Sequence, residues 1–200
     1  MDDVIIVGIS AGENRRSWFI NRNYDYTTSI DTLDDRNAEI EFGYPKGSLN
    51  SGGAEFLKCI KTEIVPFIDK HYKTNSNRGI SGHSLGGLFS AYCFINSDGY
   101  FTRFGIHSPS LWWKKEELLD KAVFQFTTND TWNIPNTKVY MSVGEEEARM
   151  VSTMVKFSTY LEDSNYENIE FKWQIFDEES HLTVISANSN RTLTVLFGKK

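Results

Sequence analysis

A serine flanked by glycines carries the strongest chemical signal in this chain, in the run Gly82-His83-Ser84-Leu85-Gly86. A short strand is expected just before this run, near residues 79–81, and an apolar helix just after it, with Gly87 extending the run. A turn this tight leaves no room for side chains two residues before and two residues after the serine. The pattern predicts that Ser84 is a nucleophile at the end of a sheet. The competing interpretation is a glycine-rich turn that only connects a strand to a helix.

A serine hydroxyl is a weak nucleophile until a base removes its proton. In the strand–turn–helix arrangement the chain order is serine, acid, histidine. His181 fits this order, because it lies just past the last predicted strand, where a loop can return it to Ser84. His83 adjoins the nucleophile and should point away from it, His107 precedes every acidic candidate, and His71 ends a long predicted helix. We therefore expect His181 to be the general base.

The acid that orients the histidine should follow the predicted strand that ends at Gly144. Glu145, Glu146 and Glu147 all stand there. Acidic residues at the start of a helix also offset its dipole, and many are merely solvated. Spacing alone does not choose among the three.

Short β-rich runs alternate with amphipathic segments along most of the chain. Strands are expected at residues 4–9, 79–81, 104–107, 138–143 and 170–176, and helices at residues 56–68, 88–95, 150–161 and near 193–197. This alternation indicates an α/β fold with a mostly parallel sheet covered on both faces. Residues 10–51 are polar and too long for an ordinary connection, so they should hold further elements. Pro66 should kink or interrupt its helix. No linker or repeat appears, so residues 1–200 are interpreted as one domain.

The composition excludes several classes of protein. Hydrophobic residues make up 40% of the 200 residues and charged residues 24%, which is typical of a folded globular chain. The net charge of −6 argues against nucleic-acid binding. The longest apolar run, at residues 4–7, is far too short for a membrane span. No secretory signal pattern opens the sequence as written. A cytoplasmic localisation is therefore expected from it, although the compartment is left open. The four histidines are dispersed, and we expect no metal.

Four segments together resemble a known family. SGHSLGG, HSPSLWW, VYMSVGEEE and ESHLTV are similar, in that order, to the esterase D-like "putative esterase" family of α/β-hydrolases. Within it they are most similar to the branch of siderophore esterases of the enterobactin-hydrolysing kind. The residues at 22–27 are similar to the family's R-x-x-D-x-T loop. The resemblance runs from about residue 4 to residue 197.

The resemblance implies a serine carboxylic-ester hydrolase that works through an acyl-enzyme, needs no cofactor and takes a small-molecule ester. It implies Glu147 as the acid, three residues after the strand-ending glycine. It also implies that the backbone N–H of Leu85 is one oxyanion donor. Acyl transfer to an alcohol on the same fold stays open. A non-catalytic binding domain, or an inactive fragment, is the alternative of a different class. The oligomeric state is not predicted.

The N-terminal part departs from the family pattern. The strand expected at residues 4–9 resembles the strand that follows the first helical crossover of the family. Earlier strands, and the loop that supplies the second oxyanion donor, should precede it. We therefore expect an α/β-hydrolase fold that lacks the N-terminal strands of the family, in a truncated chain.

Substrate contacts are predicted from cationic and aromatic residues. Such residues could form a wall suited to an anionic, aromatic ester, with Arg16 and Trp112 as the chosen candidates. The residues considered with them are Arg15, Trp18, Phe19 and Trp113. A solvated loop and core aromatic residues are the competing interpretations.

Overall fold

The computed structural model describes residues 3–10, 12 and 14–198. The chain divides into two compact units. The sheet unit comprises residues 1–4 and 75–200, and the helical unit comprises residues 5–74. Each unit is described by itself, and the single domain expected over residues 1–200 stays a prediction.

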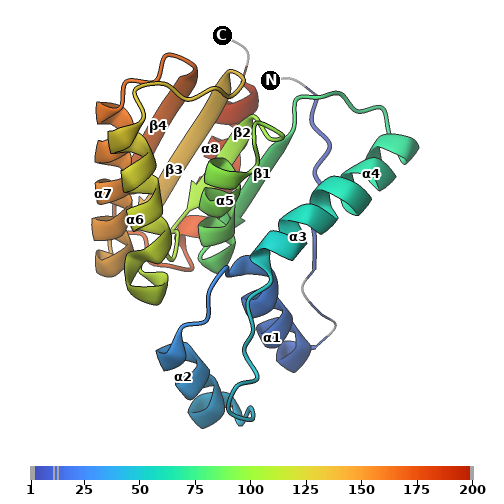
Figure 1. Ribbon diagram of the computed structural model, residues 1–200, viewed down its shortest axis with the longest axis vertical. Coiled ribbons are helices and arrows are strands. Elements are labelled where there is room, and N and C mark those ends of the chain that lie inside the picture. Colours follow the sequence, from blue (N-terminus) through green and yellow to red (C-terminus); the bar gives the residue numbers. More distant parts are fainter. Residues whose placement is uncertain (1–2, 11, 13, 199–200) are drawn as a thin grey trace. The chain divides into compact units, whose positions relative to one another are not determined.

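A four-stranded sheet forms the centre of the sheet unit (Figure 1). Its strands are β1 (Gly79–His83), β2 (Arg103–His107), β3 (Thr137–Gly144) and β4 (Ile169–Phe176). They are parallel and lie in the order β1-β2-β3-β4, so four of the five predicted strands are confirmed. Because His83 pairs with His107 and His107 with Ser142, the carboxyl ends of the first three strands meet at one edge.

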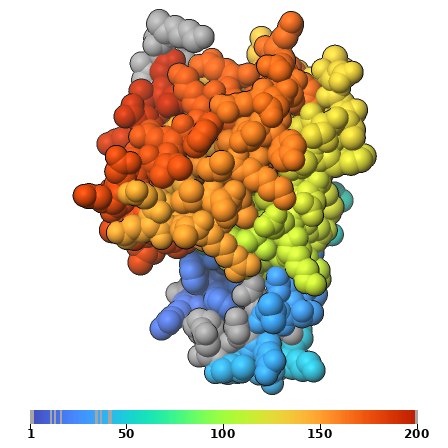
Figure 2. Space-filling view, turned by 90° about the vertical axis from the view of Figure 1, so that its left-hand side faces the viewer, coloured from blue at the N-terminus to red at the C-terminus, as the bar shows by residue number. Residues whose placement is uncertain are grey.

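Helices cover both faces of this sheet, as expected. The four helices are α5 (Leu85–Asn96), α6 (Trp113–Thr128), α7 (Ala148–Asp163) and α8 (Val184–Phe197). In Figure 1 the first three lie in front of the sheet and α8 lies behind it. Figure 2 shows the side of this unit where orange residues, which include α7, form much of the surface. The predicted helices at 88–95, 150–161 and near 193–197 are confirmed, whereas α6 lies outside the predicted set.

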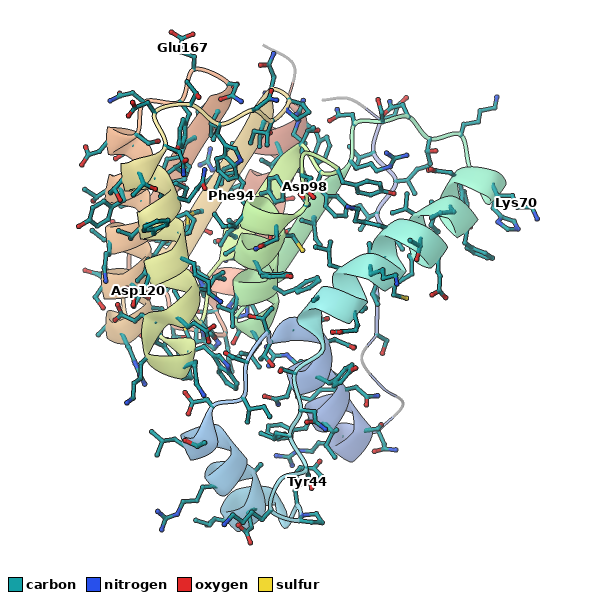
Figure 3. The ribbon with its side chains drawn as sticks, viewed as in Figure 1. Tyr44, Lys70, Phe94, Asp98, Asp120 and Glu167 are labelled. Atoms are coloured by element: carbon teal, nitrogen blue, oxygen red, sulfur yellow. The ribbon has the colours of Figure 1, made fainter. Side chains whose placement is uncertain are left out.

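The core of the sheet unit is rich in aromatic side chains. Phe94 of α5, labelled in Figure 3, lies 5.2 Å from the Phe104 ring of β2 and 5.0 Å from Trp132. Phe126 of α6 and Phe157 of α7 stack edge to face at 5.2 Å. Edge-to-face pairs of this kind contribute about 0.5–1.5 kcal/mol beyond the burial of their area. This cluster therefore ties three helices to one face of the sheet.

Short-range features shape the helical unit, which contains α1 (Arg15–Tyr26) and α2 (Thr32–Phe42). The Asp31 carboxylate accepts a hydrogen bond from the Leu33 N–H at 2.9 Å and caps the start of α2. Gly43 ends α2 in the left-handed conformation that glycine adopts without strain. A small core forms where the Tyr44 ring, labelled in Figure 3, stacks on Phe19 at 5.5 Å. The long polar stretch at residues 10–51 thus holds two helices.

The predicted irregularity at Pro66 takes the form of a wide helical turn. Helix α3 (Gly53–Cys59) passes into a π-helical segment, η1 (Ile60–Ile64), and then into α4 (Val65–His71). In η1 the Val65 N–H donates to the Ile60 carbonyl, one residue farther back than in an α-helix. A proline cannot donate to the carbonyl four residues before it, and its ring clashes with that group. The wide turn makes room for the ring, so the helical path continues past Pro66.

The strand expected at residues 4–9 is wrong. These residues have no strand structure, and the Ile6 side chain is 73% exposed. A buried parallel strand needs neighbours to satisfy its backbone and cover its side chains. In the described part of the chain, β1 pairs with β2 alone and β4 with β3 alone, so this run joins neither edge. An apolar pattern predicts a buried strand only where a neighbouring strand is present.

Candidate active site

A one-residue turn between β1 and α5 carries Ser84. Strand β1 ends at His83 and α5 begins at Leu85, so Ser84 makes the whole reversal. Its backbone angles, φ 65° and ψ −121°, lie in a region that L-residues rarely adopt. Strain of this kind costs about 1–3 kcal/mol and persists only where the surroundings enforce it.

Two glycines make the tight turn possible. A Cβ on Gly82 would lie 2.1 Å from the Gly86 carbonyl oxygen, and a Cβ on Gly87 would lie 2.5 Å from the His107 carbonyl oxygen. Neither backbone oxygen can move aside without opening the turn. These contacts explain why glycine is needed at position 82 of the pattern and at position 87, which extends it.

Hydrogen bonds from the neighbouring strand fix the backbone of Ser84. Its N–H donates to the His107 carbonyl at 3.0 Å. Its own carbonyl accepts from the Ser110 N–H at 3.2 Å and from the Leu88 N–H at 3.0 Å. The loop after β2 therefore holds the turn in place.

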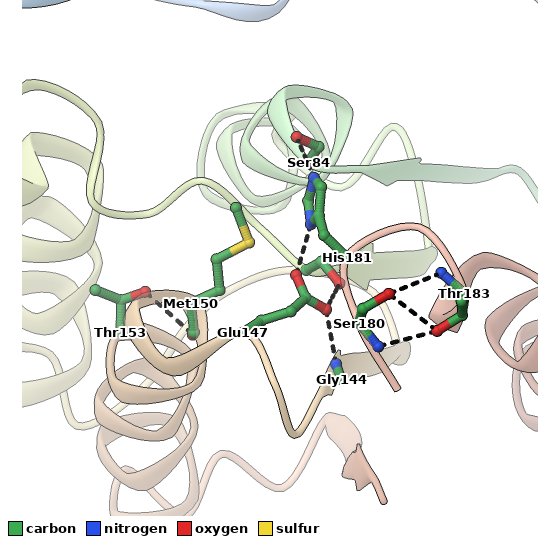
Figure 4. Close-up of polar contacts among 9 residues, drawn as sticks. Ser84, Gly144, Glu147, Met150, Thr153, Ser180, His181 and Thr183 are labelled. Carbon is green, nitrogen blue, oxygen red and sulfur yellow. Dashed lines mark hydrogen bonds and ion pairs between the residues drawn. The ribbon is translucent and has the colours of Figure 1, made fainter. Parts of the chain in front are cut away.

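A chain of hydrogen bonds links the serine, the histidine and one glutamate (Figure 4). The Oγ of Ser84 lies 3.1 Å from the Nε2 of His181, and the Nδ1 of His181 lies 2.6 Å from the Oε2 of Glu147. The Glu147 side chain is 3% exposed and that of His181 is 36% exposed. The imidazole thus stands between a buried carboxylate and a hydroxyl that solvent can approach.

The second oxygen of Glu147 is also fully engaged. Its Oε1 accepts from the Ser108 hydroxyl at 2.7 Å and from the Gly144 N–H at 2.8 Å. Burial alone would raise the pKa of Glu147, but the hydrogen bonds from His181, Gly144 and Ser108 outweigh it, so its pKa lies below the usual value. The carboxylate is therefore ionised at neutral pH and can hold a proton on Nδ1 of His181.

The other two glutamates do not contact the histidine. Glu145 and Glu146 are exposed, and the carboxylate of Glu145 accepts from the Glu178 N–H at 3.1 Å. The sequence had left all three glutamates open on spacing, and Glu147 is the one that reaches His181.

The loop that carries Glu147 is bonded to the loop that carries His181. The Glu145 N–H donates to the Phe176 carbonyl at 2.9 Å, and the Glu146 N–H donates to the Glu179 carbonyl at 3.1 Å. A Cβ on Gly144 would lie 2.2 Å from that same Glu179 oxygen. Acid and base thus sit on two segments that are held together backbone to backbone.

A buried polar network lies between the sheet and α8. The ring of His107 shares hydrogen bonds with Ser142 at 2.7 Å and with Thr192 of α8 at 2.8 Å. Ser142 in turn bonds Asn188 of α8 at 2.5 Å. Burial, with the nearby His83, lowers the pKa of His107 to about 3, so the ring is neutral. The network anchors the helix that begins just after His181.

The remaining predicted residues lie in different places. Leu85 is the first residue of α5, where helix N–H groups have no partner within the helix. Trp112 is half-buried, and the guanidinium of Arg149 lies 4.4 Å from the centre of its ring. Arg16 is part of α1 in the helical unit, and its side chain lies outside the described residues. Trp113 is buried, in line with a core role.

Sequence reasoning missed several residues at this site. Ser108 binds the acid from a left-handed backbone position, with φ 41°. It belongs to the run HSPSLWW, which carried the family resemblance without a role for this serine. Arg149 had no signal, because it meets Trp112 only in the folded chain.

Two further observations concern only the part of the chain that the structure describes. None of its groups of histidine, cysteine, aspartate and glutamate is arranged to hold a metal ion. None of its helices is both long and apolar enough to span a membrane.

Comparison with known proteins gives consistent matches. Residues 1–192 match the family described as "Putative esterase". The ferri-bacillibactin esterase BesA of Bacillus subtilis is 28% identical over 148 residues, which cover 71% of this chain and 51% of BesA. The apo-salmochelin esterase of Escherichia coli is 30% identical over 120 residues, which cover 59% of this chain and 36% of that protein. The chain thus spans about half the length of BesA, and less of the other relative.

Solved structures show the same fold. The BES protein from Bacillus cereus superposes with a TM-score of 0.73 and 25% identity, over 88% of this chain and 65% of that one. The siderophore hydrolase EstA from Aspergillus nidulans superposes with a TM-score of 0.74 and 18% identity, over 91% of this chain and 67% of that one. The parallel sheet, the helices on both faces and the family match agree with the fold class that the sequence predicts. The chain belongs to the "Putative esterase" family and has the α/β-hydrolase fold.

Proposed function

We propose that this protein is a serine esterase that hydrolyses a small carboxylic ester through an acyl-enzyme. The observation that carries the proposal is the unbroken chain from the Ser84 hydroxyl through His181 to the ionised Glu147. Nucleophile, base and orienting acid are the three groups that acyl transfer by serine requires. No observation of comparable weight favours a binding role alone.

The first half of the reaction forms the acyl-enzyme. His181 Nε2 takes the proton of Ser84 as Oγ attacks the ester carbonyl carbon and the carbonyl oxygen becomes an oxyanion. The Leu85 N–H, at the start of α5, donates to that oxyanion. The C–O bond to the alcohol then breaks, and protonated His181 gives its proton to the leaving alkoxide. Glu147 stabilises the imidazolium in between.

The second half releases the acid. Water enters beside the partly exposed His181, which removes one water proton as the oxygen attacks the acyl carbon. Collapse of this second oxyanion breaks the bond to Ser84 Oγ, which takes the proton back from His181. The products are one carboxylic acid and one alcohol.

The relatives' names point to the substrate class. One relative is named as an esterase of ferri-bacillibactin and the other as an esterase of apo-salmochelin. These names support the siderophore-like or aromatic ester that the family resemblance implies as the substrate here. Trp112 is the proposed substrate contact of the sheet unit. Trp112 lies two residues after Ser110, whose backbone N–H donates a hydrogen bond to the Ser84 carbonyl.

The test is covalent labelling with a fluorophosphonate, followed by intact mass. We expect a single adduct on the folded protein and none on Ser84→Ala, together with hydrolysis of a p-nitrophenyl ester that the variant loses by at least about 10⁴-fold. A folded protein that takes no adduct and hydrolyses no ester would contradict the proposal.

A second measurement separates hydrolysis from acyl transfer. The protein is incubated with an ester and an excess of an acceptor alcohol, and the products are quantified. We expect the free acid to dominate. Formation of the exchanged ester as the main product would assign the chain to acyl transfer by the same residues.

A further inference from the structure

An arginine stacked on a tryptophan is a feature of the sheet unit that the proposed reaction does not use. The Cζ of Arg149, in the first turn of α7, lies 4.4 Å from the centre of the Trp112 ring. Arg149 is exposed and Trp112 is half-buried, so solvent reaches the pair. Stacking on an aromatic face holds a guanidinium in place while its N–H edge stays available for hydrogen bonds.

This pair bridges the two loops that support the candidate active site. Arg149 stands two residues after Glu147, which binds His181. Trp112 stands two residues after Ser110, whose N–H binds the Ser84 carbonyl. Two residues span at most about 7 Å of chain. The Cα atoms of Arg149 and Trp112 therefore lie within this distance of those of Glu147 and Ser110, past the carboxyl ends of β3 and β2.

The charge of Arg149 is not neutralised within the described structure. Among the residues whose side chains are described, no carboxylate pairs with it. Two of the three glutamates just before it are engaged elsewhere, since Glu147 binds His181 and Glu145 binds the Glu178 N–H. Arginine is well suited to carboxylates and similar anions because its planar fork donates parallel hydrogen bonds.

A strained segment adds positive charge just after Trp112. Lys114 and Lys115 both have left-handed backbone angles, with φ of 50° and 56°, and both are exposed. Left-handed conformations cost L-residues about 1–2 kcal/mol each. The strained turn thus places two lysines close in sequence to the Arg149–Trp112 pair, in a chain whose net charge is −6.

We infer that Arg149, held on the face of Trp112, binds an anionic oxygen of the ester substrate beside Ser84. The inference rests on the proposed esterase function and deepens it. The ligand class is an ester that carries a carboxylate or another anionic oxygen within reach of Arg149. Arg149 is then a residue that determines specificity for charge, and Trp112 is its support.

The test compares two esters of similar length, p-nitrophenyl hydrogen glutarate, which is anionic, and p-nitrophenyl valerate, which is neutral. The readout is the ratio of their kcat/KM values. Arg149→Gln should lower the anionic-to-neutral ratio by about 10- to 100-fold, the worth of a charged hydrogen bond. Arg149→Lys should recover part of it. Lys121→Gln, which removes an exposed charge on α6, should leave the ratio unchanged. An unchanged ratio in Arg149→Gln, or an equal fall in Lys121→Gln, would overturn the inference.

A binding measurement keeps this inference separate from the proposed function. Ser84→Ala is titrated with phenylacetate and with phenylacetamide, which differ mainly in charge, by calorimetry. We expect tighter binding of the carboxylate, and loss of that preference when Arg149→Gln is added. Equal binding of the two ligands to Ser84→Ala would overturn the inference. Because this measurement needs no turnover, a protein that fails the labelling test can still bind the anion.

Discussion

Most of the buried apolar side chains belong to the sheet unit, and fewer belong to the helical unit. In the sheet unit, side chains of β2 and β3 such as Ile106 and Met141 are completely buried. In the helical unit, Ile6, Leu33 and Ile40 are each about seven-tenths exposed. Packing therefore constrains the apolar residues at these positions of the sheet unit more strongly than those at these positions of the helical unit.

The difference follows from the kind of contact that holds each unit together. The sheet unit is built from pairings between strands that are distant in sequence, and each strand covers its neighbours. The helical unit depends more on contacts within a few residues, such as the Asp31 cap and the left-handed Gly43. Catalytic residues need contacts between distant strands, because a buried framework with many such contacts holds their side chains in one geometry. Ser84, Glu147 and His181 all belong to the sheet unit.

The largest expected effect is on activity, within the sheet unit. Glu147→Gln keeps the size of the side chain but removes the charge that stabilises the imidazolium, so kcat should fall by about 10³- to 10⁴-fold. Ester hydrolysis under saturating substrate measures it.

Glu146→Gln is the matched control, since that side chain is exposed in the same loop. Its kcat should stay within about threefold of the parent value, as for a surface substitution away from reacting groups. If the two variants lost activity equally, the assignment of the acid would be wrong.

The next effect is on stability and compares the two units directly. Ile106→Ala removes a fully buried side chain of β2 and should lower the free energy of unfolding by about 2–5 kcal/mol. Ile6→Ala, at an exposed position, should change it by less than about 0.5 kcal/mol. Urea unfolding measures both. A loss for Ile6→Ala as large as that for Ile106→Ala would show that this run is covered in solution.

The effect that is smallest per unit of change is a slope of the free energy of unfolding with pH. The pKa of His107 is about 3 in the folded chain and near 6.5 when unfolded, so only the unfolded state binds this proton between those values. The free energy of unfolding should therefore fall as the pH is lowered from about 6.5 towards 3, by up to about 1.4 kcal/mol per pH unit from this group. Urea unfolding of the parent and of His107→Gln at several pH values measures its share.

NMR of the parent protein checks the same point without a substitution. The ring signals of His107 should remain those of a neutral imidazole at pH 5. A ring that titrates near pH 6.5 would contradict the neutral, buried network.

Much of the sheet unit was predictable from sequence because its patterns are local. The strands β1 to β4 are short segments between turn signals, β4 alternates apolar with polar residues, and the glycines around Ser84 mark the turn. Residues 4–9 carry the same pattern yet form no strand. The apolar pattern indicates that a segment should be buried. The strands and helices that would bury it come from elsewhere in the chain.

The site divides in the same way. Ser84 and His181 could be chosen from motif and order, but residue types alone could not separate Glu147 from Glu145 and Glu146. Glu147 is the proposed acid because its carboxylate reaches the His181 ring once the loop after β3 is hydrogen-bonded to the loop after β4. Ser108 and Arg149 stayed hidden for the same reason, since each meets its partner across a gap in sequence of about 37–39 residues.

The sequence by itself therefore determined the four strands of the sheet and three of the helices that cover it, the tight turn at Ser84 and the class of chemistry that this turn serves. These follow from short-range sterics and from hydrophobic periodicity, which a few neighbouring residues express. Only the tertiary structure decided which glutamate joins His181, which serine supports that glutamate, and that Arg149 rests on Trp112. Those pairings exist because parallel strands bring the ends of distant segments to one edge of the sheet, and no local pattern encodes which side chains meet there.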